Sequence, residues 1–494
     1  NVPFFVDEAL PGDTFSVSST FFARMATPIF PIMDNLKMDS FFFAVPVRLL
    51  WDNWARMHGE QRNPGDSTDF VVPTMTSPPI NGYDEGSLED YLGLPTGIPD
   101  LEHSSLFHRA HNLIHNEWFR DENLTDSVIN NVDDGPDSNL DYALYRRSKR
   151  HDYFTSALPW PQKGESISIP LGTRADVKGI GKEDQTFGAS VNAYESGGTG
   201  QVQYLSATRI GDGSAGETHS MEEDPNNPGF PNIYADLTTA TAATINQLRQ
   251  SFQIQKMLER DARGGTRLTE VILAHFGVRS PDARMQRPEY LGGGSAPIAL
   301  QQVASTVPND FTENNTPQGN LAAYGIGVSS NNSFTKSFTE HCIILGYVNV
   351  RADITYQQGL NRMFSRSTRY DFYYPALSHI GEQAVLNKEI YAQGLPADED
   401  VFGYQERHAE YRYKPSQISG AFRSSAAAPL DAWHLSQDFA TLPVLDQTFI
   451  EENPPIDRVI AVPTEPHFLF DSYTSMKCAR PMPVYGVPGL IDHF

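Results

Sequence analysis

The chain contains only two cysteines among its 494 residues, Cys342 and Cys478, and neither belongs to a CxxC pair. Two thiols are too few for a disulfide framework, and free cysteines of this kind are usually buried. We therefore expect a protein of a reducing compartment, with a buried thiol at each of the two positions.

Long hydrophobic runs are missing as well. The densest apolar stretch, FFFAVPV at 41–47, ends at Arg48. It is well short of the roughly 18 residues that a membrane-spanning helix needs. The opening residues, NVPFFVDEALPGD, carry acidic side chains where a secretory signal carries positive charge. The sequence thus predicts no membrane insertion and no secretory signal.

Basic residues are scarce, because 37 lysines and arginines face 61 aspartates and glutamates, which gives a formal net charge of -24. Four of the basic residues nevertheless fall within 146–151, which reads RRSKRH. Like charges this close repel one another. The cluster therefore needs counter-charge from solvent ions, from a partner subunit or from a polyanion.

Aromatic and turn-forming residues, in contrast, are plentiful. The 29 phenylalanines and 21 tyrosines supply a core, and 37 glycines with 35 prolines imply many turns. The clearest strand is 347–356, in which apolar and polar residues alternate. Its core-facing residues are predicted to be Val348, Val350, Ala352 and Ile354, while the other face meets water or a partner. Further strands are predicted at 13–22, 39–47, 165–171 and 405–415.

Helical periodicity marks the segment 238–262, where Ile245, Leu248 and Phe252 share one face. We expect this face to dock on the main body or on a neighbouring subunit. Helices do not alternate regularly with strands, so the predicted fold class is all-β, an antiparallel sandwich with long insertions. Two further helices are predicted at 104–120 and 266–277.

The stretch 172–232 differs in kind from the rest of the chain. It is polar and rich in glycine, with too few apolar residues for a core of its own. A loop this long in a compact protein is either functional or unstructured. We interpret it as an insertion that projects from the main body, and a flexible surface loop is the alternative.

A histidine set in the helix predicted at 104–120 is the nearest approach to a metal site. His111 and His115 have the i, i+4 spacing of zinc ligands, and His108 lies one turn earlier. Asn112 stands where the HExxH motif needs a glutamate, and no third ligand is apparent. We therefore predict a partly buried helix face and no metal site.

The acidic stretch 121–141 matches a calcium loop only in part. Asp137, Asn139 and Asp141 correspond to the first three ligand positions of an EF-hand. Tyr142 stands where the loop requires glycine, and the glutamate at the twelfth position is missing. We expect a solvated acidic loop, and a loose calcium site is the alternative.

Phosphate-binding and nucleophile motifs are incomplete too. GIGVSS at 325–330 lacks the third glycine of GxGxxG, and GxSxG does not occur. We therefore expect no enzyme, no catalytic residues and no cofactor. Two other classes stay open: a glycan-binding β-sandwich, and a glycoside hydrolase with a pair of catalytic carboxylates.

Several sequence blocks are too long and specific for a generic β protein. They include FFVDEALPGDTFSV, FFFAVPVRLLWDNW at 41–54, NLIHNEWFRDENL at 112–124, KRHDYFTSALPWPQKG at 149–164, the stretch 245–293, and FGYQERHAEYRYKPSQISG at 402–420. These blocks closely resemble the major capsid protein of gokushoviruses, small icosahedral bacteriophages of the family Microviridae. The resemblance spans nearly the whole chain, except 172–232, which matches no family block.

The resemblance implies an eight-stranded antiparallel jelly roll, one domain over 1–494, that self-assembles into a T=1 icosahedral shell. It implies a circular single-stranded DNA genome inside, and a protrusion at the three-fold axes, matched here by 172–232, that serves host attachment. The implied partners are further copies of the chain, the DNA, small DNA-binding, pilot and scaffolding phage proteins, and a bacterial surface receptor. The implied location is the virion, assembled in the host bacterial cytoplasm.

Such a shell would give the basic cluster a role, because a net-negative subunit can still turn positive charge inward to phosphates. The candidate nucleic-acid-binding residues are Arg146, Arg147, Lys149, Arg150, Tyr145 and Tyr153, the tyrosines by stacking on unpaired bases. The alternative is that these arginines pair with carboxylates of 121–141, such as Asp133, Asp134 or Asp137, in the same subunit or in a neighbour.

Overall fold

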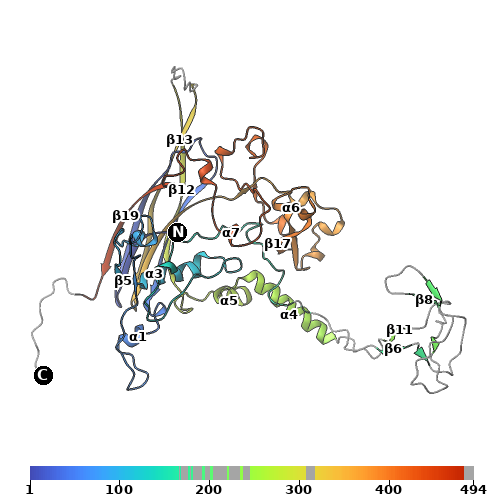
Figure 1. Cartoon of the computed structure of the whole chain (residues 1–494), viewed down its shortest axis with the longest axis horizontal. Helices are drawn as coiled ribbons and strands as arrows, with labels where there is room; N and C mark the ends of the chain where they lie inside the picture. Colours follow the sequence, from blue (N-terminus) through green and yellow to red (C-terminus); the bar gives the residue numbers. More distant parts are fainter. Residues whose placement is uncertain are drawn as a thin grey trace, which may run out of the picture. The chain divides into compact units, whose positions relative to one another are not determined.

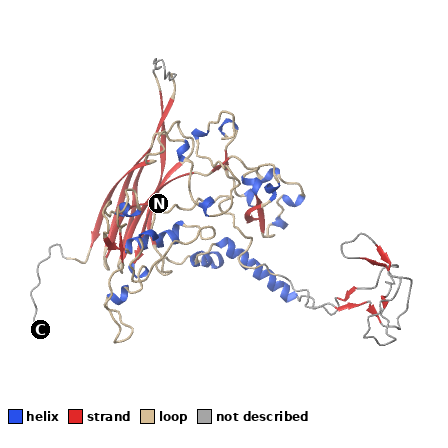
Figure 2. Ribbon diagram, viewed as in Figure 1, coloured by secondary structure: helices blue, strands red, loops and turns tan. Residues whose placement is uncertain are grey.

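The structure is a computed structural model that describes residues 1–165, 167, 245–306 and 318–482, together with six short strands between 176 and 236. The chain divides into two compact units, Asn1–Pro161 with Asp261–Phe494, and Gln162–Arg260. The first unit contains the large sheet, and Figure 2 distinguishes its strands from its helices.

The first unit is built on one antiparallel sheet of seven strands (Figure 1). Their order is β1-β14-β3-β12-β13-β2-β19, and every neighbouring pair is antiparallel. The strands are β1 (Val2–Ala9), β2 (Thr14–Met25), β3 (Leu36–Pro46), β12 (Glu289–Ala304), β13 (Leu321–Ser337), β14 (Cys342–Ala352) and β19 (Phe468–Ala479). The all-β class and the strands predicted at 13–22 and 39–47 are confirmed. The described residues contribute seven strands to this sheet, where the resemblance implies eight.

The sheet curls until its two edge strands, β1 and β19, nearly meet. The ring centroids of Phe4 in β1 and Phe470 in β19 lie 6.1 Å apart, yet in the described chain these two strands are not paired with each other. A cavity of about 730 Å³ follows this seam, and Val2 and Phe468 contribute to its wall. The sheet is therefore an incomplete barrel with an inner and an outer face.

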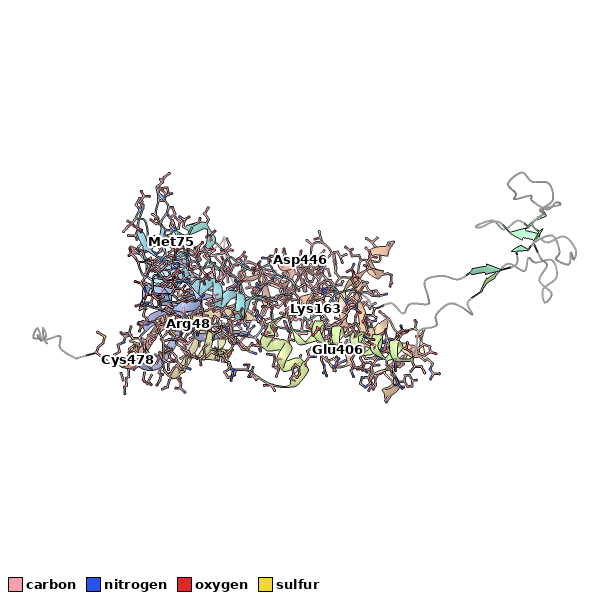
Figure 3. The ribbon with its side chains drawn as sticks, turned by 90° about the horizontal axis from the view of Figure 1, so that it is seen from below. Arg48, Met75, Lys163, Glu406, Asp446 and Cys478 are labelled. Atoms are coloured by element: carbon pink, nitrogen blue, oxygen red, sulfur yellow. The ribbon has the colours of Figure 1, made fainter. Side chains whose placement is uncertain are left out.

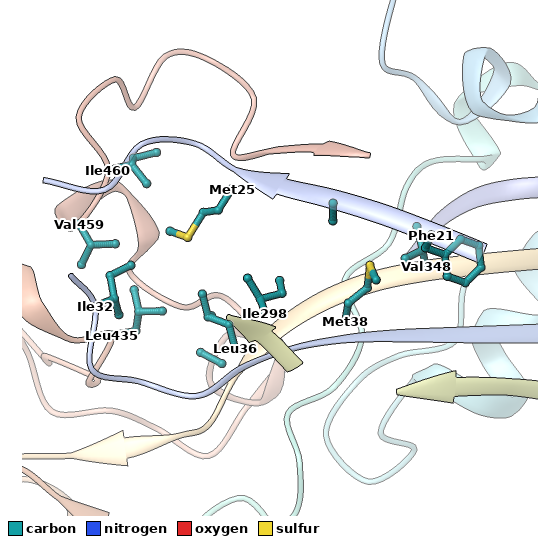
Figure 4. Packing of buried hydrophobic residues seen from close by; sticks show 12 residues of the cluster. Phe21, Met25, Ile32, Leu36, Met38, Ile298, Val348, Leu435, Val459 and Ile460 are labelled. Atoms are coloured by element: carbon teal, nitrogen blue, oxygen red, sulfur yellow. The ribbon is translucent and has the colours of Figure 1, made fainter. Parts of the chain in front are cut away.

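The inner face of the sheet forms the main core. Odd-numbered residues of β2 point inward, and Phe21 and Met25 are fully buried. Burying a side chain of this size contributes roughly 1.5–3 kcal/mol, so the cluster supplies much of the stability of the sheet. Figure 4 shows residues of the cluster from β2, β3, β12, β14 and three connecting segments: Phe21, Met25, Ile32, Leu36, Met38, Ile298, Val348, Leu435, Val459 and Ile460.

Strand β14 is buried on both faces, which the alternation at 347–356 did not predict. Val348 and Ala352 face the inner core as expected, Val350 packs at its margin, and Ile354 is partly buried beyond the end of the strand. Tyr347 on the opposite face is buried as well. The expectation that this second face meets water or a partner is wrong, because a helix covers it.

That helix is α3 (Leu106–Ile114), which continues as a π-helical turn at His115–Phe119. Its residues Ala110 and Ile114 are fully buried in a cluster with Leu345 and Tyr347 of β14. The helix predicted at 104–120 is therefore confirmed, and its apolar stripe packs on the outer face of β3 and β14.

The remaining elements of the first unit are short. The expected strand at 405–415 is largely wrong, because β17 ends at Glu406 and the chain turns at His408, whose φ is 65°. A 3-10 turn at Ala409–Tyr411 follows, so consecutive residues Ala409 and Glu410 are both buried. The other short elements are α1 (Trp54–Met57), β4 (Thr74–Thr76), α2 (Leu88–Leu92), β5 (Glu102–Ser104), β15 (Thr355–Tyr356), β16 (Glu382–Leu386), α6 (Asn387–Ile390), β17 (Val401–Glu406), β18 (Ser416–Gln417) and α7 (Gln447–Ile450).

Two longer helices agree with the predicted segments 238–262 and 266–277. They are α4 (Ile245–Gly264) and α5 (Leu268–Phe276), and α5 ends at Gly277, whose φ of 70° suits a residue without a side chain. On α4, Ile245 and Phe252 are 70% and 63% exposed, and Leu248 is half-buried. Docking of this face, on the main body or on a neighbouring subunit, stays a prediction.

The described residues of the second unit include three short antiparallel strand pairs. They are β6 (Asp176–Lys178) with β11 (Tyr234–Asp236), β7 (Ile180–Gly181) with β10 (Ser220–Met221), and β8 (Asn192–Tyr194) with β9 (Gln201–Gln203). The rest of 172–232, and most of the strand predicted at 165–171, lie outside the described residues. The projecting insertion therefore stays a prediction.

The two cysteines differ in their surroundings. Cys342 is buried in the inner core, and burial raises the pKa of its thiol to about 12. Cys478 is exposed near the end of the edge strand β19, so its predicted burial is wrong (Figure 3). Among the described residues, no helix combines the length and the apolar character required to cross a membrane.

Candidate nucleic-acid interface

The basic cluster 146–151 lies in an extended segment held on both sides by backbone hydrogen bonds. The amide of Ser148 donates to the carbonyl of Phe119 at 3.0 Å, and the amide of Lys149 donates to the carbonyl of Ile450 at 2.8 Å. In extended backbone, successive side chains point to opposite sides. Arg147 and Lys149 therefore point inward, whereas Arg146 and Arg150 are exposed.

Lys149 is held inside the protein. Its side chain is packed over the ring of Phe449 at 4.5 Å, and its ammonium group donates to the carbonyl of Phe449 at 2.5 Å. Only 7% of the residue is exposed. Desolvation disfavours the charged amine and lowers the pKa of Lys149 to about 8. Lys149 thus presents no surface to a nucleic acid.

Arg147 joins a buried group of charges that spans distant parts of the chain. Its guanidinium lies over the rings of Phe41 and Phe119, and its Nη1 is 3.7 Å from Oδ2 of Asp39. Arg351 of β14 also reaches Asp39, and its Nη1 lies 3.9 Å from Oε2 of Glu452. Arg147 therefore pairs within the chain, but with Asp39 and not with the acidic stretch 121–141.

Burial controls the ionisation of this charge group. Desolvation and, to a smaller extent, the nearby Arg351 together lower the pKa of Arg147 to about 10. Desolvation also raises the pKa of Glu452 to about 7, although Arg351 and Arg147 oppose that shift. The group is costly to keep charged and depends on its internal pairs, which is the behaviour of a structural ion network.

The two exposed members of the cluster are Arg146 and Arg150. The Arg150 side chain is 50% exposed, and its only ion pair among the described residues is with Asp353 at 3.7 Å. An exposed pair of that length contributes little to stability. Arg146 is exposed and is one of the residues that line the seam cavity. These two side chains are the part of the cluster that a polyanion can reach.

Both candidate tyrosines already make contacts within the chain. Tyr153 is buried, and its hydroxyl donates to Oε2 of Glu389 at 2.9 Å, so stacking on a base would require its ring to leave these contacts. Tyr145 packs against His111 and His115 with ring centroids 5.8 Å and 4.7 Å away. Stacking by Tyr145 would require it to leave these rings.

The histidines predicted to form a partly buried helix face are fully buried. His111 contacts the hydroxyl of Tyr347 at 3.0 Å and the carbonyl of Ala143 at 3.1 Å, which uses both ring nitrogens. Desolvation lowers the pKa of His108 and of His111 to about 3. Within the described part of the chain, no group of three potential metal ligands is found.

Asp137, the first residue of the incomplete calcium loop, is bound to protein groups instead. Arg109 is fully buried, and its Nε and Nη2 donate to the two carboxylate oxygens of Asp137 at 2.8 Å and 2.6 Å. The hydroxyl of Tyr142 donates to the same carboxylate at 2.5 Å. This bidentate pair locks the loop onto α3 and leaves Asp137 committed to a structural contact.

Comparison of the sequence with known proteins identifies the family of the chain. A family profile described as "Capsid protein (F protein)" matches residues 1–490. The chain belongs to this phage capsid protein family. The capsid protein is 46% identical over 501 residues to the capsid protein VP1 of Bdellovibrio phage phiMH2K, an alignment that covers 100% of the chain and 92% of the relative. The corresponding proteins of Chlamydia phage 1 and Spiroplasma virus 4 are 44% identical over 554 residues and 35% identical over 510 residues, with 99% and 92% coverage in both.

Family membership confirms the predicted resemblance to gokushovirus major capsid proteins. The capsid protein is a structural component of the virion that assembles with its own copies into a shell, and the family is not an enzymatic one. The glycoside hydrolase and the glycan-binding sandwich are therefore set aside as identities.

Sequence reasoning missed the partners of the basic cluster. Asp39 and Arg351 lie far from 146–151 along the chain and on different strands, and no motif links them. Glu452 gave no signal either, because two glutamates before an Asn-Pro pair are typical of a loop. Only the folded sheet brings β3, β14 and the cluster together.

Proposed function

We propose that this capsid protein forms a T=1 icosahedral shell around a circular single-stranded DNA genome and is assembled in the host bacterial cytoplasm. The observation that carries the proposal is the seven-stranded antiparallel sheet in a chain matched over 1–490 by a phage capsid family. An antiparallel sandwich with long insertions is a common building block of viral shells.

Fewer residues of the basic cluster are available to contact the genome than its sequence indicates. Arg146 and Arg150 are exposed and point to the same side of an extended segment, so they are the members proposed to meet phosphates. Small DNA-binding, pilot and scaffolding phage proteins are proposed as further partners. Their recognition would also use charge, because the chain carries a net charge of -24.

Host attachment is proposed for the insertion 172–232, at the three-fold axes of the shell. Its polar composition suits an outer surface, and it lies within the compact unit Gln162–Arg260, distinct from the sheet. A bacterial surface receptor is its proposed partner. Replacing 172–232 by a short Gly-Ser linker should leave shells intact and abolish adsorption to host cells; particles that adsorb normally would contradict the attachment role.

The decisive experiment for the shell is electron cryomicroscopy of purified particles. The proposal expects closed icosahedral shells with one copy of the chain per asymmetric unit and DNA inside. Digestion with a nuclease specific for single strands, after the particles are opened, should destroy that DNA. Shells with several copies per asymmetric unit, or with double-stranded contents, would contradict it.

A further inference from the structure

Two short segments next to α6 and β17, 362–374 and 407–414, form what we call the aromatic–arginine surface (Figure 1). One third of their residues are aromatic, against 11% of the whole chain. All of these aromatic side chains are exposed, by between 37% and 70%. They are Phe364, Tyr370, Phe372, Tyr373, Tyr374, Tyr411 and Tyr413. Large aromatic side chains gathered in one exposed patch point to a binding surface.

Direct contacts join the two segments into one surface. Nη2 of Arg407 donates to the carbonyl of Tyr370 at 2.6 Å, and Nη2 of Arg366 donates to Oε1 of Glu410 at 3.2 Å. The guanidinium of Arg366 also lies 4.3 Å from the ring centre of Tyr411. These contacts fix the rings relative to one another, so the surface exists before any partner arrives.

The charge of this surface opposes that of the chain. The two segments contain six basic residues and two acidic ones, whereas the whole chain has a net charge of -24. Arg366 is paired with Glu410, and Arg412 with Glu406. Arg369 and Lys414 form no ion pair with any described residue, and Arg369 lies 5.8 Å and 5.7 Å from the ring centres of Tyr370 and Tyr374.

We propose that the aromatic–arginine surface binds single-stranded DNA, with bases stacked on its exposed rings and phosphates held by Arg369 and Lys414. Unpaired bases stack on aromatic side chains whatever their sequence, and arginine adds cation–π contacts. A polyanion binds to basic side chains that are not already paired with carboxylates of the same chain. The inference rests on the proposed function, because it needs a single-stranded genome inside the shell.

A second copy of the chain is the main competing occupant, since tyrosine and arginine are also enriched where proteins meet. Two observations favour DNA. The surface retains unpaired cations, whereas Lys149 of the basic cluster and the nearby Tyr153 are held by internal contacts. A shell that holds a single strand therefore needs stacking rings elsewhere, and this surface presents them together with free positive charge.

Ultraviolet crosslinking of genome-containing particles tests the proposal without any mutation. After nuclease and protease digestion, mass spectrometry should find nucleotide adducts on peptides from 362–374 or 407–414. Tyr473, 72% exposed on β19, is the internal control and should carry none. Adducts found only on other peptides, or on none, would overturn the inference. Particles that contain no single-stranded DNA would instead contradict the proposed function.

A variant pair separates DNA binding from contact between copies. Tyr370→Ala with Arg369→Gln should lower the affinity of full-length unassembled subunits for oligo(dT) by roughly 5- to 100-fold for each stacked base lost, with shell yield unchanged. Tyr473→Ala should alter neither. Lost shell formation with full oligo(dT) affinity would assign the surface to a second copy. Where both are lost, Tyr370→Trp decides: stacked bases should quench its fluorescence, and no quenching would overturn the inference.

Discussion

Arg351 of β14 places its Nε 2.9 Å from Oδ2 of Asp39 on the adjacent strand β3. The carboxylate lies close to Arg147 as well, so it balances two guanidinium groups at the margin of the sheet. Because all three side chains are largely buried, water cannot take over the task of Asp39. The basic cluster is thereby tied to the strands of the barrel.

Replacing Asp39 by alanine should destabilise the subunit. Two buried cations would lose their carboxylate, and removing one partner of a buried ion pair costs about 3 kcal/mol or more. Denaturant unfolding of Asp39→Ala against the wild type measures the loss. Asp471→Ala, on the exposed face of the edge strand β19, is the control and should stay within about 0.5 kcal/mol. If Asp39→Ala lost as little unfolding free energy as the control, the ion network would not stabilise the subunit.

Glu452 should make the stability of the subunit depend on pH. Burial raises its pKa from 4.5 to about 7, so the folded state binds this proton more tightly than the unfolded state does. The stabilisation of the folded state by this protonation is complete below pH 4.5 and is lost as the pH rises through 7. The free energy of unfolding should therefore decline as the pH rises, and Glu452→Gln should remove this part of the decline. Unfolding measured at several pH values tests this. The exposed Glu465→Gln should leave the decline unchanged.

The basic cluster should divide into two classes in a DNA-binding assay. Neutralising Arg146 and Arg150 by glutamine should reduce the log–log salt slope for oligo(dT) by about 1.4, since each contact to single strands contributes about 0.7. Lys149→Met keeps the volume of a buried side chain and should leave the slope unchanged. A flatter slope for Lys149→Met, with no effect of the double variant, would reverse the assignment.

Phe252→Ala should affect assembly and spare the subunit. The side chain is 63% exposed on α4, so its loss opens no cavity in the single chain. We expect unchanged thermal unfolding of the subunit and a reduced yield of shells. Phe42→Ala is the contrasting control, because Phe42 is fully buried and its removal should cost roughly 3–5 kcal/mol. Normal shells from Phe252→Ala would show that this face is not an interface.

Local patterns predicted the local structure of this protein well. The strand signals at 13–22 and 39–47 identified β2 and β3, and the glycine at 277 ended α5 where the sequence indicated. Period-two alternation records only that one face is buried, however. It could not reveal that Tyr347 is covered by α3, because that contact depends on a helix far away in the sequence.

The candidate site was predicted less completely, for the same physical reason. Positive charge at 146–151 is visible in the sequence, but its direction depends on extended backbone pinned by Phe119 and Ile450. The partners Asp39 and Glu452 are brought in by the sheet and its connecting loops. The sequence does not show which aromatic side chains are exposed either. The aromatic-rich segment 362–374 is equally compatible with a buried core, and only the structure shows that its rings are exposed.

The order of strands across the sheet has a consequence for synthesis. β2 pairs with β19, so a strand made at the start of the chain receives a neighbour made near residue 470. At about 5–20 residues per second, roughly 20–90 s pass before that neighbour leaves the ribosome. During this interval one edge of β2 is open to strands of other nascent chains. Slow translation or crowded polysomes should therefore favour mispaired chains, and rapid completion of β19 protects the newborn subunit.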